Sequence, residues 1–574
     1  MALLLSCREV KKDFGEVCIL NKISFDIAVG DRIGLVGLNG AGKTTLANII
    51  SGNIEIEGGN ICWHKKSVNI GYLKQESAYI GTMAIEESSE AFLSASSKIG
   101  LKKVQEWGEE KLENLSGGEK TKLSISKVWA LNPDLLILDE PTNHLDYQGV
   151  QWLINEVKKY RGTVIIISHD RYFLDECVTR IVEIENSTLQ EYNGNYSFYR
   201  EEKKRRYESQ LNEYMLQEEK KRKIDEQIDA LKTWSAKAHR DAPAKARAAG
   251  NKKGGKEFLR VKAKKMDIQI KSRIKKLEKI KVEGVEKPKE ERKIDFRISS
   301  VQLKGNRIIE AANITKAFNN KILFKGSSFY IQKGEKVGVF GENGCGKTTL
   351  LKLLLGIEKT DEGEIFLSSS ARVGYLSQDI SELELHKKVL DYFDISSREE
   401  RGKLQTLLFN VGFDESMLDR TIDSLSLGEV TRLRIVQLIV KEYDLLILDE
   451  PLNHLDIHSR EKLEEVLESY NGTILLVSHD RYMVERICNK LVVFEKNKIK
   501  KLEFGLKEFL ESKLLVKKNN SKDKREKMML IENEMSYVLG ELCKYPEGSY
   551  EYLELDLKFK DLVSKKKVLQ ADLS

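Results

Sequence analysis

An internal duplication constrains the possible folds of this chain more than any other sequence feature. Four short motifs occur twice in the same order, and each second copy lies 303 to 310 residues after the first. The first copies begin at Gly37, Gly71, Leu135 and Ile167, and the second copies begin at Gly341, Gly374, Leu445 and Val477. Chance matches would not keep one order at nearly one spacing, so we predict a tandem repeat of one domain over about residues 3–195 and 307–502.

Each copy alternates short apolar runs with amphipathic, helix-like segments. This alternation is typical of an α/β domain with a largely parallel sheet. The longest apolar runs, such as 163–167 and 474–477, have strand length and fall far short of the ~20 residues that span a bilayer. The first residues lack a secretory signal pattern, and the seven cysteines form no C-x-x-C pair. We therefore expect a cytoplasmic protein without a membrane segment, a disulfide framework or a zinc site.

The first duplicated motif has the P-loop pattern G-x-x-x-x-G-K-T. An apolar strand over 31–36 leads into it and a helix is predicted from its lysine onward, which is the context that the pattern requires. Its glycines let backbone N–H groups surround phosphate oxygens, its lysine reaches the β- and γ-phosphates, and the next threonine binds Mg²⁺. A glycine-rich turn with a coincidental lysine is the alternative, which two copies in the same context disfavour. The predicted ATP ligands are Gly37, Leu38, Asn39, Gly40, Ala41, Gly42, Lys43, Thr44 and Thr45 in the first copy, and Gly341, Glu342, Asn343, Gly344, Cys345, Gly346, Lys347, Thr348 and Thr349 in the second.

A pair of adjacent acids follows an apolar strand in each copy. The strand is expected to be buried, so the acids lie at its carboxyl end, where open α/β sheets bind ligands. The aspartates are predicted to hold Mg²⁺ through water, and the glutamates to polarise the water that attacks ATP. A histidine after another apolar strand can contact the γ-phosphate, and its recurrence disfavours a role in core packing. These residues are Asp139, Glu140 and His169 in the first copy, and Asp449, Glu450 and His479 in the second.

A further motif completes a family resemblance. Leu115-Ser-Gly-Gly-Glu119 recurs as Leu425-Ser-Leu-Gly-Glu429. Together with the P-loop, Gln75, the acid pair, Asn143-His-Leu-Asp146 and the histidine, this order resembles the ATP-binding cassette ATPases. The resemblance implies two cassettes that face each other head to tail and enclose two ATP molecules. Each γ-phosphate would be capped by the LSGGE motif of the opposite cassette.

The resemblance also implies which residues form these caps. The site built on Lys347 would be completed by Ser116, Gly117 and Gly118, and the site built on Lys43 by Ser426 and Gly428. Leu427 stands where the family has glycine. A side chain at that position is expected to crowd the phosphate, so equal turnover at the two sites is left open.

Four other residues match family positions. Gln75 and Gln378 are implied as ligands of ATP and Mg²⁺. Phe14 and Phe318 each lie 29 residues before their P-loop lysine and match the aromatic residue that stacks on adenine. A role for either phenylalanine in the hydrophobic core is the alternative.

The long segment between the cassettes indicates which branch of the cassette ATPases the chain resembles. About 110 residues join the two copies, the interval from Gln75 to Leu115 is short, and no apolar run could span a membrane. This organisation resembles the ABC-F proteins, which act on ribosomes. The alternatives are the ATPase subunit of a transporter, or a nucleic-acid repair or chromatin ATPase, whose usual zinc pairs or long coiled coils are missing. We expect a first cassette at 1–198, a helical hairpin linker at 199–303, a second cassette at 304–505 and a C-terminal helical extension at 506–574.

The linker concentrates the positive charge of the chain. Between Leu231 and Lys279 it carries 17 basic and 4 acidic residues, a net charge of +13 against +6 for the whole chain. Apolar residues at a spacing of three to four predict two amphipathic helices that pack as an antiparallel hairpin. We expect the helix to break between Ala236 and Gly255, because Pro243 and three glycines lie there.

The tip of the hairpin, about 234–260, combines basic and aromatic residues. This mixture suits RNA phosphates and unstacked bases, with a solvated linker as the plainer alternative. The predicted RNA-binding residues are Trp234, Lys237, His239, Arg240, Lys245, Arg247, Lys252, Lys253, Lys256, Phe258 and Arg260.

Two roles compete within the ABC-F resemblance. Housekeeping translation factors tend to carry a helical arm between the glutamine loop and LSGGE, for which this chain leaves no room, whereas antibiotic-resistance members tend to extend the linker tip. We therefore predict a ribosome-protection factor that enters the exit-tRNA site with ATP bound, with its tip near the peptidyl-transferase centre. The implied drugs are lincosamides, pleuromutilins and A-type streptogramins. A housekeeping translation factor is the alternative.

The resemblance implies ATP and Mg²⁺ as cofactors and the bacterial ribosome as partner. Contact would be made through ribosomal RNA, with the peptidyl-site tRNA as a further candidate. We expect a monomer whose two cassettes form an internal pseudo-dimer. The last stretch, about 511–574, predicts a helical hairpin with its turn at 543–549, serving either as a second RNA contact or as a packing appendage.

Overall fold

The computed structural model describes two compact units. The described residues are 2–74, 117–143, 145–248, 253–283, 285, 307–318, 321–377, 386–393, 397–441, 443–453, 455–542, 544–546 and 549–571. One unit comprises Met1–Leu145 and Gly149–Lys293, and the other comprises Asp146–Gln148 and Ile294–Ser574. Each unit contains one copy of the duplicated domain.

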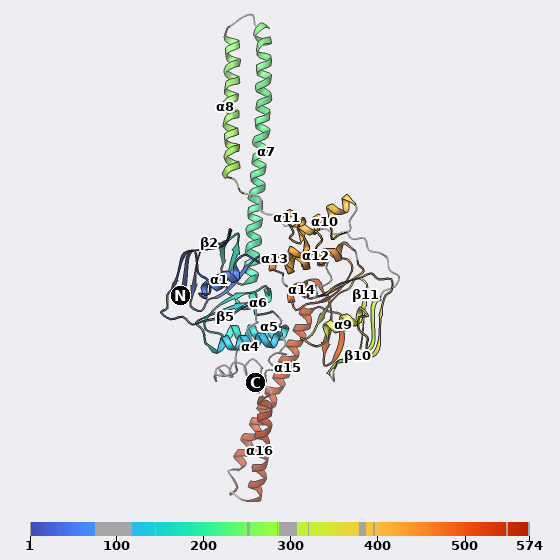
Figure 1. The fold of residues 1–574 in the computed structure, drawn as a ribbon. Helices are drawn as coiled ribbons and strands as arrows, with labels where there is room; N and C mark the ends of the chain where they lie inside the picture. The colour runs from blue at the N-terminus through green and yellow to red at the C-terminus, as the bar shows by residue number, and fades with distance from the viewer. Residues whose placement is uncertain are drawn as a thin grey trace. The chain divides into compact units, whose positions relative to one another are not determined.

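The first cassette consists of two sheets and the helices that cover them (Figure 1). A three-stranded antiparallel sheet has the order β2-β1-β4, from β1 (Leu3–Phe14), β2 (Val17–Ala28) and β4 (Gly58–Trp63). A six-stranded sheet has the order β5-β6-β7-β3-β8-β9, from β3 (Arg32–Gly37), β5 (Ile70–Leu73), β6 (Leu135–Asp139), β7 (Thr163–Ile167), β8 (Arg180–Glu185) and β9 (Thr188–Tyr192). The described helices are α1 (Lys43–Ile50), α4 (Gly117–Ala130), α5 (Tyr147–Lys159) and α6 (Arg171–Cys177).

The second cassette repeats this topology. Its small sheet has the order β11-β10-β13, from β10 (Arg307–Phe318), β11 (Lys321–Gln332) and β13 (Glu362–Leu367). Its large sheet has the order β14-β15-β16-β12-β17-β18, from β12 (Lys336–Phe340), β14 (Val373–Leu376), β15 (Leu445–Asp449), β16 (Thr473–Val477), β17 (Lys490–Glu495) and β18 (Lys498–Leu502). The helices are α9 (Lys347–Leu354), α10 (Arg398–Asn410), α11 (Glu415–Leu418), the 3₁₀ helix η4 (Ile422–Ser424), α12 (Leu427–Val440), α13 (Ile457–Ser469) and α14 (Arg481–Ile487). The predicted duplication of an α/β domain is therefore confirmed.

The central strands of each large sheet are buried along their whole length. Every residue of β6, β7, β15 and β16 is buried, and these strands pair in parallel. A parallel strand has both faces covered, which explains why its sequence is a continuous apolar run with no alternation of polar residues. Because these strands are buried, the polar residues at their carboxyl ends are held in defined positions.

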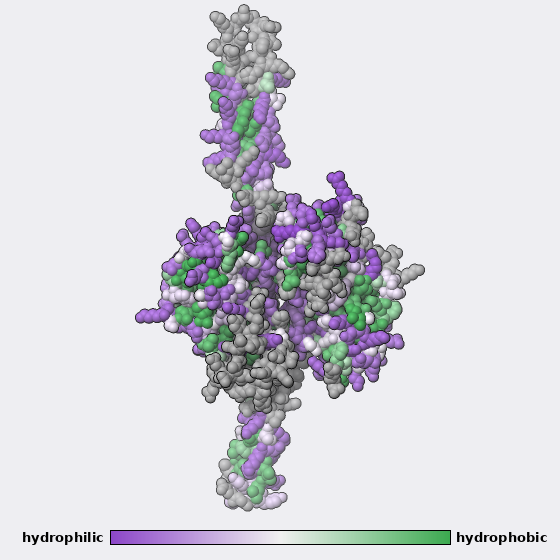
Figure 2. Space-filling model, in the orientation of Figure 1, coloured by the Kyte–Doolittle hydropathy of each residue, from purple (hydrophilic) through white to green (hydrophobic). Residues whose placement is uncertain are grey.

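The linker forms the predicted helical hairpin. Helix α7 (Tyr196–Ala248) and helix α8 (Lys253–Glu283) lie side by side (Figure 1). Ile228 of α7 and Leu277 of α8 are buried, and the amide of Gln217 bonds the backbone at both Ile280 and Val285. The described surface of the hairpin is mainly hydrophilic (Figure 2).

The predicted break between Ala236 and Gly255 is wrong in extent. Helix α7 continues through Pro243 to Ala248, and α8 already begins at Lys253. Proline removes one backbone hydrogen bond, but alanines alternate around Pro243, and alanine is the strongest helix former. Gly254 and Gly255 fall in the first turn of α8, where backbone N–H groups have no partner within the helix.

The C-terminal extension is also a helical hairpin, as predicted. Helices α15 (Leu506–Leu542) and α16 (Tyr550–Ala571) pack through Val538 and Leu562, both buried. Ion pairs of 2.9 Å between Lys566 and Glu532 and of 3.5 Å between Lys558 and Glu534 join the two helices. Among the described residues, no helix combines the length and the apolar character needed to cross a membrane.

The root of α7 is attached to the first cassette by a buried carboxylate. Glu183 of β8 is buried and accepts hydrogen bonds from the hydroxyl of Tyr199 at 2.7 Å and from that of Tyr192 at 3.3 Å, and it also pairs with Lys203. Glu183 lies opposite Val36 in the sheet, immediately before the P-loop. A buried charge requires such partners, because it has lost its hydration.

Replacement of Tyr199 by phenylalanine tests this attachment. The change removes one donor to the buried Glu183 carboxylate, so we expect the free energy of unfolding to fall by about 1–3 kcal/mol. Equilibrium urea unfolding of the whole chain measures the loss. Y537F, at an exposed tyrosine of α15, is the matched control and should lie within about 0.5 kcal/mol of the unmodified protein. Equal stability of Y199F and Y537F would contradict the proposed anchoring role of Glu183.

Candidate nucleotide sites

The strand–loop–helix context predicted for each P-loop is present. Strand β3 leads into helix α1, which begins at Lys43, and β12 leads into α9, which begins at Lys347. The residue before each lysine has a left-handed backbone, with φ of 100° at Gly42 and 105° at Gly346. A side chain at Gly42 would place its Cβ 2.6 Å from Ile19, so glycine is required both by backbone conformation and by space.

Each P-loop lysine closes its own loop. Lys43 Nζ donates to the carbonyl oxygens of Gly37 and Leu38, both at 2.9 Å. Lys347 Nζ donates to those of Gly341 at 2.9 Å and Glu342 at 3.2 Å. The positive charge is therefore positioned at the loop whose backbone can surround phosphate oxygens, as the sequence predicts.

The threonine after each lysine lies beside the strand aspartate. Thr44 Oγ1 donates to Asp139 Oδ2 at 3.0 Å, and Thr348 Oγ1 donates to Asp449 Oδ2 at 3.2 Å. In the first cassette the hydroxyl of Tyr72 also lies 3.4 Å from Asp139 Oδ2. Burial raises the pKa of both aspartates, against the lowering effect of these hydroxyl contacts.

These hydroxyl–carboxylate pairs fit a magnesium ion. Mg²⁺ prefers oxygen ligands and is usually held by one or two carboxylates together with phosphate oxygens. In the second cassette Asp449 Oδ1 is buried and accepts no hydrogen bond from the described residues, so it has capacity for a cation or its water. Such an ion would supply positive charge next to the phosphates, and Asp449 and Thr348 would hold it.

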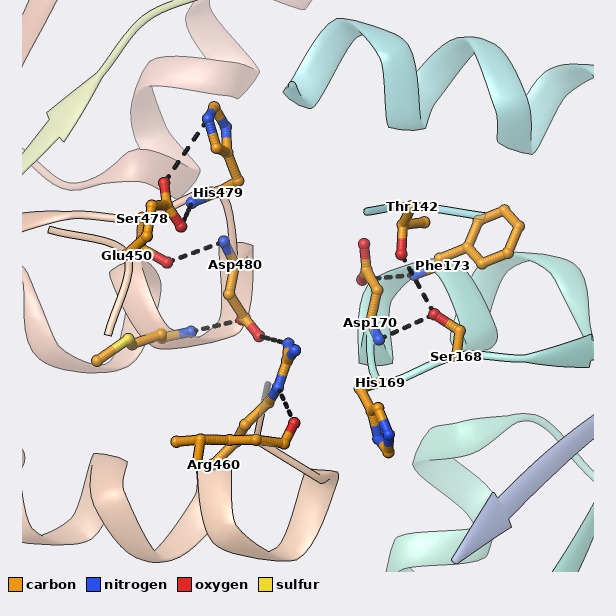
Figure 3. A network of polar contacts seen from close by, with 12 residues as sticks. Thr142, Ser168, His169, Asp170, Phe173, Glu450, Arg460, Ser478, His479 and Asp480 are labelled. Carbon is orange, nitrogen blue, oxygen red and sulfur yellow. Dashed lines mark hydrogen bonds and ion pairs between the residues drawn. The ribbon is translucent and has the colours of Figure 1, made fainter. Parts of the chain in front are cut away.

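The proposed base and the histidine lie together in both cassettes, and Figure 3 shows the pair of the second cassette. Glu140 Oε1 is 3.5 Å from His169 Nε2, and Glu450 Oε1 is 3.6 Å from His479 Nε2. Both glutamates have φ of 50°, in the left-handed region that residues other than glycine rarely adopt. Recurrence of this strained conformation at equivalent positions indicates that it serves the site.

The electrostatics of the second cassette favour uncharged forms of this pair. Burial raises the pKa of Glu450 to about 8, although Lys347 opposes the rise. Burial and the nearby Lys347 lower the pKa of His479 to about 4. At neutral pH the imidazole is therefore neutral, and its Nε2 lies 3.2 Å from Lys347 Nζ. A neutral imidazole can accept a hydrogen bond from the lysine there or donate one to a phosphate oxygen.

The two predicted adenine-stacking residues are exposed. Phe14 and Phe318 end strands β1 and β10, and neither belongs to the described core. Lys12 lies 5.4 Å from the ring centre of Phe14, and Lys316 lies 4.9 Å from that of Phe318. Exposed rings at equivalent positions argue against the alternative role in the core, and their contact with adenine stays a prediction.

The signature motif begins a helix in both cassettes. Helix α4 begins at Gly117, and α12 begins at Leu427, capped by Ser426 and Glu429 in a reciprocal capping box. The side chain of Leu427 is exposed, whereas Gly428 is buried. Gln75, Ser116 and Gln378 lie outside the described residues.

The tip residues are only partly described. Trp234 is 66 % exposed and Lys237 is also exposed. Lys252 lies outside the described residues. The other predicted residues lie in helices whose side chains there are outside the described part, with His239, Arg240, Lys245 and Arg247 in α7, and Lys253, Lys256, Phe258 and Arg260 in α8.

Sequence reasoning missed two polar side chains near the sites. Tyr72, which contacts Asp139, lies within the duplicated Gly-Tyr-Leu motif, so comparison of the copies could have found it. Arg460, which bonds Asp480 next to His479, has no arginine counterpart in the first copy and gave no repeat signal.

The raised pKa of Glu450 predicts a pH dependence of stability. Between about pH 6.5 and 8 the folded chain keeps a proton that Glu450 has lost in the unfolded chain, so rising pH lowers the free energy of unfolding. One proton gives at most about 1.4 kcal/mol per pH unit. The lowered pKa of His479 has the opposite effect, with stability lost as pH falls below about 6.5, so the window above 6.5 separates the effect of Glu450 from that of His479.

Unfolding measured at several pH values in the nucleotide-free protein tests this. E450Q should lose the slope between pH 6.5 and 8. E400Q, at an exposed glutamate of α10, should keep it. The same slope in E450Q as in the unmodified protein would show that Glu450 is not the responsible group.

Comparison with protein families places the two cassettes in a known group. A family profile described as ABC transporter matches residues 20–143 and 324–453. A second profile with the same description matches residues 182–253, which cover the end of the first cassette and all of α7.

Relatives match nearly the whole chain. The ribosome protection protein VmlR of Bacillus subtilis (strain 168) is 38% identical over 568 residues, which cover 99% of this chain and 98% of the relative. ABC transporter F family member 2 of Arabidopsis thaliana is 32% identical over 84% of this chain and 75% of its own length.

Solved structures share the fold. The archaeal ribosome recycling factor aABCE1, solved in complex with the ribosomal stalk protein aP1, has a TM-score of 0.58 at 20% identity and covers 88% of this chain and 92% of its own. A structure named RNase-L Inhibitor has a TM-score of 0.59 at 20% identity and covers 89% of this chain and 93% of its own. Duplicated cassettes, a helical linker between them and full-length relatives agree, and this chain belongs to the ABC-F family of ATPases.

Proposed function

We propose that this ATPase binds bacterial ribosomes with ATP held and protects them from antibiotics. The observation that carries the proposal is the hairpin α7–α8, which joins the two cassettes along the chain. At 1.5 Å per residue, the 53 residues of α7 span about 80 Å, which suits penetration into a large RNA assembly. The match to VmlR, named a ribosome protection protein, covers both cassettes and the hairpin, and this supports the same class of partner.

The basic tip is the proposed contact with ribosomal RNA. The segment 231–279 has a net charge of +13, and Trp234 presents an exposed ring close to its start. Lysine and arginine neutralise phosphates, and an aromatic ring can stack on an unpaired base. We propose that the protein occupies the exit-tRNA site and that the tip lies near the peptidyl-transferase centre and the peptidyl-site tRNA. There it would promote release of lincosamides, pleuromutilins or A-type streptogramins.

ATP would control this contact through closure of the cassettes. In each site the P-loop lysine and the threonine–aspartate pair would hold ATP and Mg²⁺, and the glutamate would orient the attacking water. Ser426 and Gly428, with Ser116 and Gly118, would cap the γ-phosphates. Hydrolysis would remove the γ-phosphate that holds the closed form and so permit release from the ribosome, in the cytoplasm.

Replacement of both glutamates tests the assignment of the bases. E140Q/E450Q keeps the P-loops, so ATP binding should stay within about threefold, whereas phosphate release should fall by ~100-fold or more because the polarising carboxylates are lost. Sedimentation with ribosomes should show retention that depends on ATP. E400Q serves as the control. Normal ATP turnover by the double variant would refute the assignment.

Removal of charge from the tip tests the RNA contact. A variant with Lys237, Arg240, Lys245 and Arg247 all replaced by alanine should lose ribosome affinity with a shallower salt dependence, by about 3 units of log–log slope. A control variant replaces Lys204, Arg205, Lys220 and Arg222, the same number of charges on the same helix nearer its root. ATP hydrolysis without ribosomes should be equal in the two variants. Equal ribosome affinity in the two variants would contradict the role of the tip.

Drug susceptibility distinguishes protection from a housekeeping role in translation. Expression in a sensitive bacterium should raise the inhibitory concentration of at least one of the three drug classes, and the tip variant should abolish the rise. If no drug of this ribosomal site is affected while ribosome binding persists, the housekeeping translation factor is the correct alternative.

A further inference from the structure

One arginine forms hydrogen bonds to both loops that carry the proposed catalytic pair of the second cassette, Glu450 and His479. Arg460, in the first turn of α13, donates from Nε to the carbonyl oxygen of Leu455 at 2.9 Å. It also donates from Nη1 to Asp480 Oδ2 at 3.3 Å (Figure 3). Leu455 lies in the loop that follows Glu450, and Asp480 is the residue after His479. Arg460 therefore contacts both loops.

The pair of Arg460 and Asp480 is shielded from solvent. Their side chains are 14% and 8% exposed, so water and salt screen their attraction far less than at the surface. Asp480 Oδ1 accepts a hydrogen bond from Met483 N at 3.0 Å and so caps α14, while Asp480 N donates to Ser478 Oγ at 3.1 Å. Removal of the guanidinium would leave a largely buried carboxylate at the turn that presents His479.

The first cassette joins the same two loops by other chemistry. The position equivalent to Arg460 is Val150, 310 residues earlier, whose side chain has no hydrogen-bond donor. There Thr142 Oγ1 lies 3.3 Å from Ser168 Oγ and connects the loops. The residue equivalent to Thr142 is Leu452, which is buried and has no hydroxyl.

The first cassette shows that the cassette fold can form without an arginine at this position. The first cassette has the same strand order, the same left-handed glutamate and the same contact of glutamate with histidine, yet it has valine at this position. The fold alone therefore does not demand Arg460. Its bonds to Leu455 and Asp480 act on the place where Glu450, His479 and Lys347 meet, with contacts of 3.2 to 3.6 Å among them.

We propose that Arg460 is a positioning residue for ATP hydrolysis in the second cassette. It holds the turn at Asp480 so that His479 stays beside Glu450 and Lys347. The inference rests on the roles proposed above for Glu450 and His479. A misplacement of catalytic groups by about 1 Å can lower a rate by ~100-fold. The hydrogen bonds of Arg460 to this loop are therefore expected to affect turnover more than ATP binding.

The test uses the full chain with only one site active. In an E140Q background, R460M keeps an unbranched side chain but removes both hydrogen bonds and the charge. We expect kcat to fall by about tenfold or more, with the KM for ATP within about threefold, because Arg460 does not contact the P-loop. R460K should recover part of kcat, since a lysine restores the charge. In an E450Q background, where the first site remains, R460M should change neither constant.

Several outcomes would overturn the proposal. An unchanged kcat for E140Q/R460M, or an equal loss in both backgrounds, would reduce Arg460 to a structural residue. A loss that R460K does not relieve would have the same consequence. Thermal unfolding verifies that each variant is folded, and R460Q replaces R460M if the latter is not. Failure of the base assignment is seen separately, as residual turnover by E140Q/E450Q with Arg460 intact.

Discussion

A backbone hydrogen bond at the end of the central sheet sets the geometry on which both nucleotide sites depend. Glu140 N donates to Ile167 O at 2.8 Å, and Glu450 N donates to Val477 O at 2.9 Å. Each bond joins the residue after one buried strand to the last residue of its neighbour. The chain turns there with φ of 50°, a conformation that is unfavourable for glutamate without such support. The turn leaves the carboxylate beside the histidine that follows the neighbouring strand, so strain in the backbone fixes the distance between the two groups for which we propose catalytic roles.

The two copies share this backbone turn and differ in the side-chain contacts around it. Buried Glu183 bonds the root of α7 in the first copy, whereas the equivalent residue of the second copy is Val493, which packs with Phe509 of α15 in an apolar core. The loops that carry the glutamate and the histidine are joined by hydroxyl groups in one copy and by Arg460 in the other. The two copies therefore share the contacts that hold the sheet and differ in the contacts at the helical arms and at these loops.

Much of this arrangement could be predicted from the sequence because its signals are local. A buried parallel strand is a continuous apolar run, and a P-loop is a contiguous motif, so both can be located from the sequence. The resemblance of the ordered motifs to a known family added the functional roles. The bond of Arg460 to Asp480 could not be predicted, because the two residues are 20 positions apart and the repeat offers no parallel. Glu183 gave no signal either, since a single acid in an apolar strand does not reveal the tyrosines that will bond it. Proline and glycine alone do not predict where the linker helix breaks, because the helix-forming alanines around Pro243 keep α7 continuous to Ala248.

Helix α7 runs without interruption from the first cassette to the start of the hairpin tip. Its root is bound to Glu183, whose backbone lies opposite Val36, and the P-loop begins at the next residue, Gly37. A buried polar cluster of this kind contributes less to stability than to a single arrangement, because each donor must stay aligned to keep the carboxylate satisfied. A shift of the P-loop strand would therefore be resisted or transmitted at the root of the helix, not absorbed there. Pro243 removes one backbone hydrogen bond near the other end of α7, close to the basic tip, whereas the root is held by the polar contacts of Glu183.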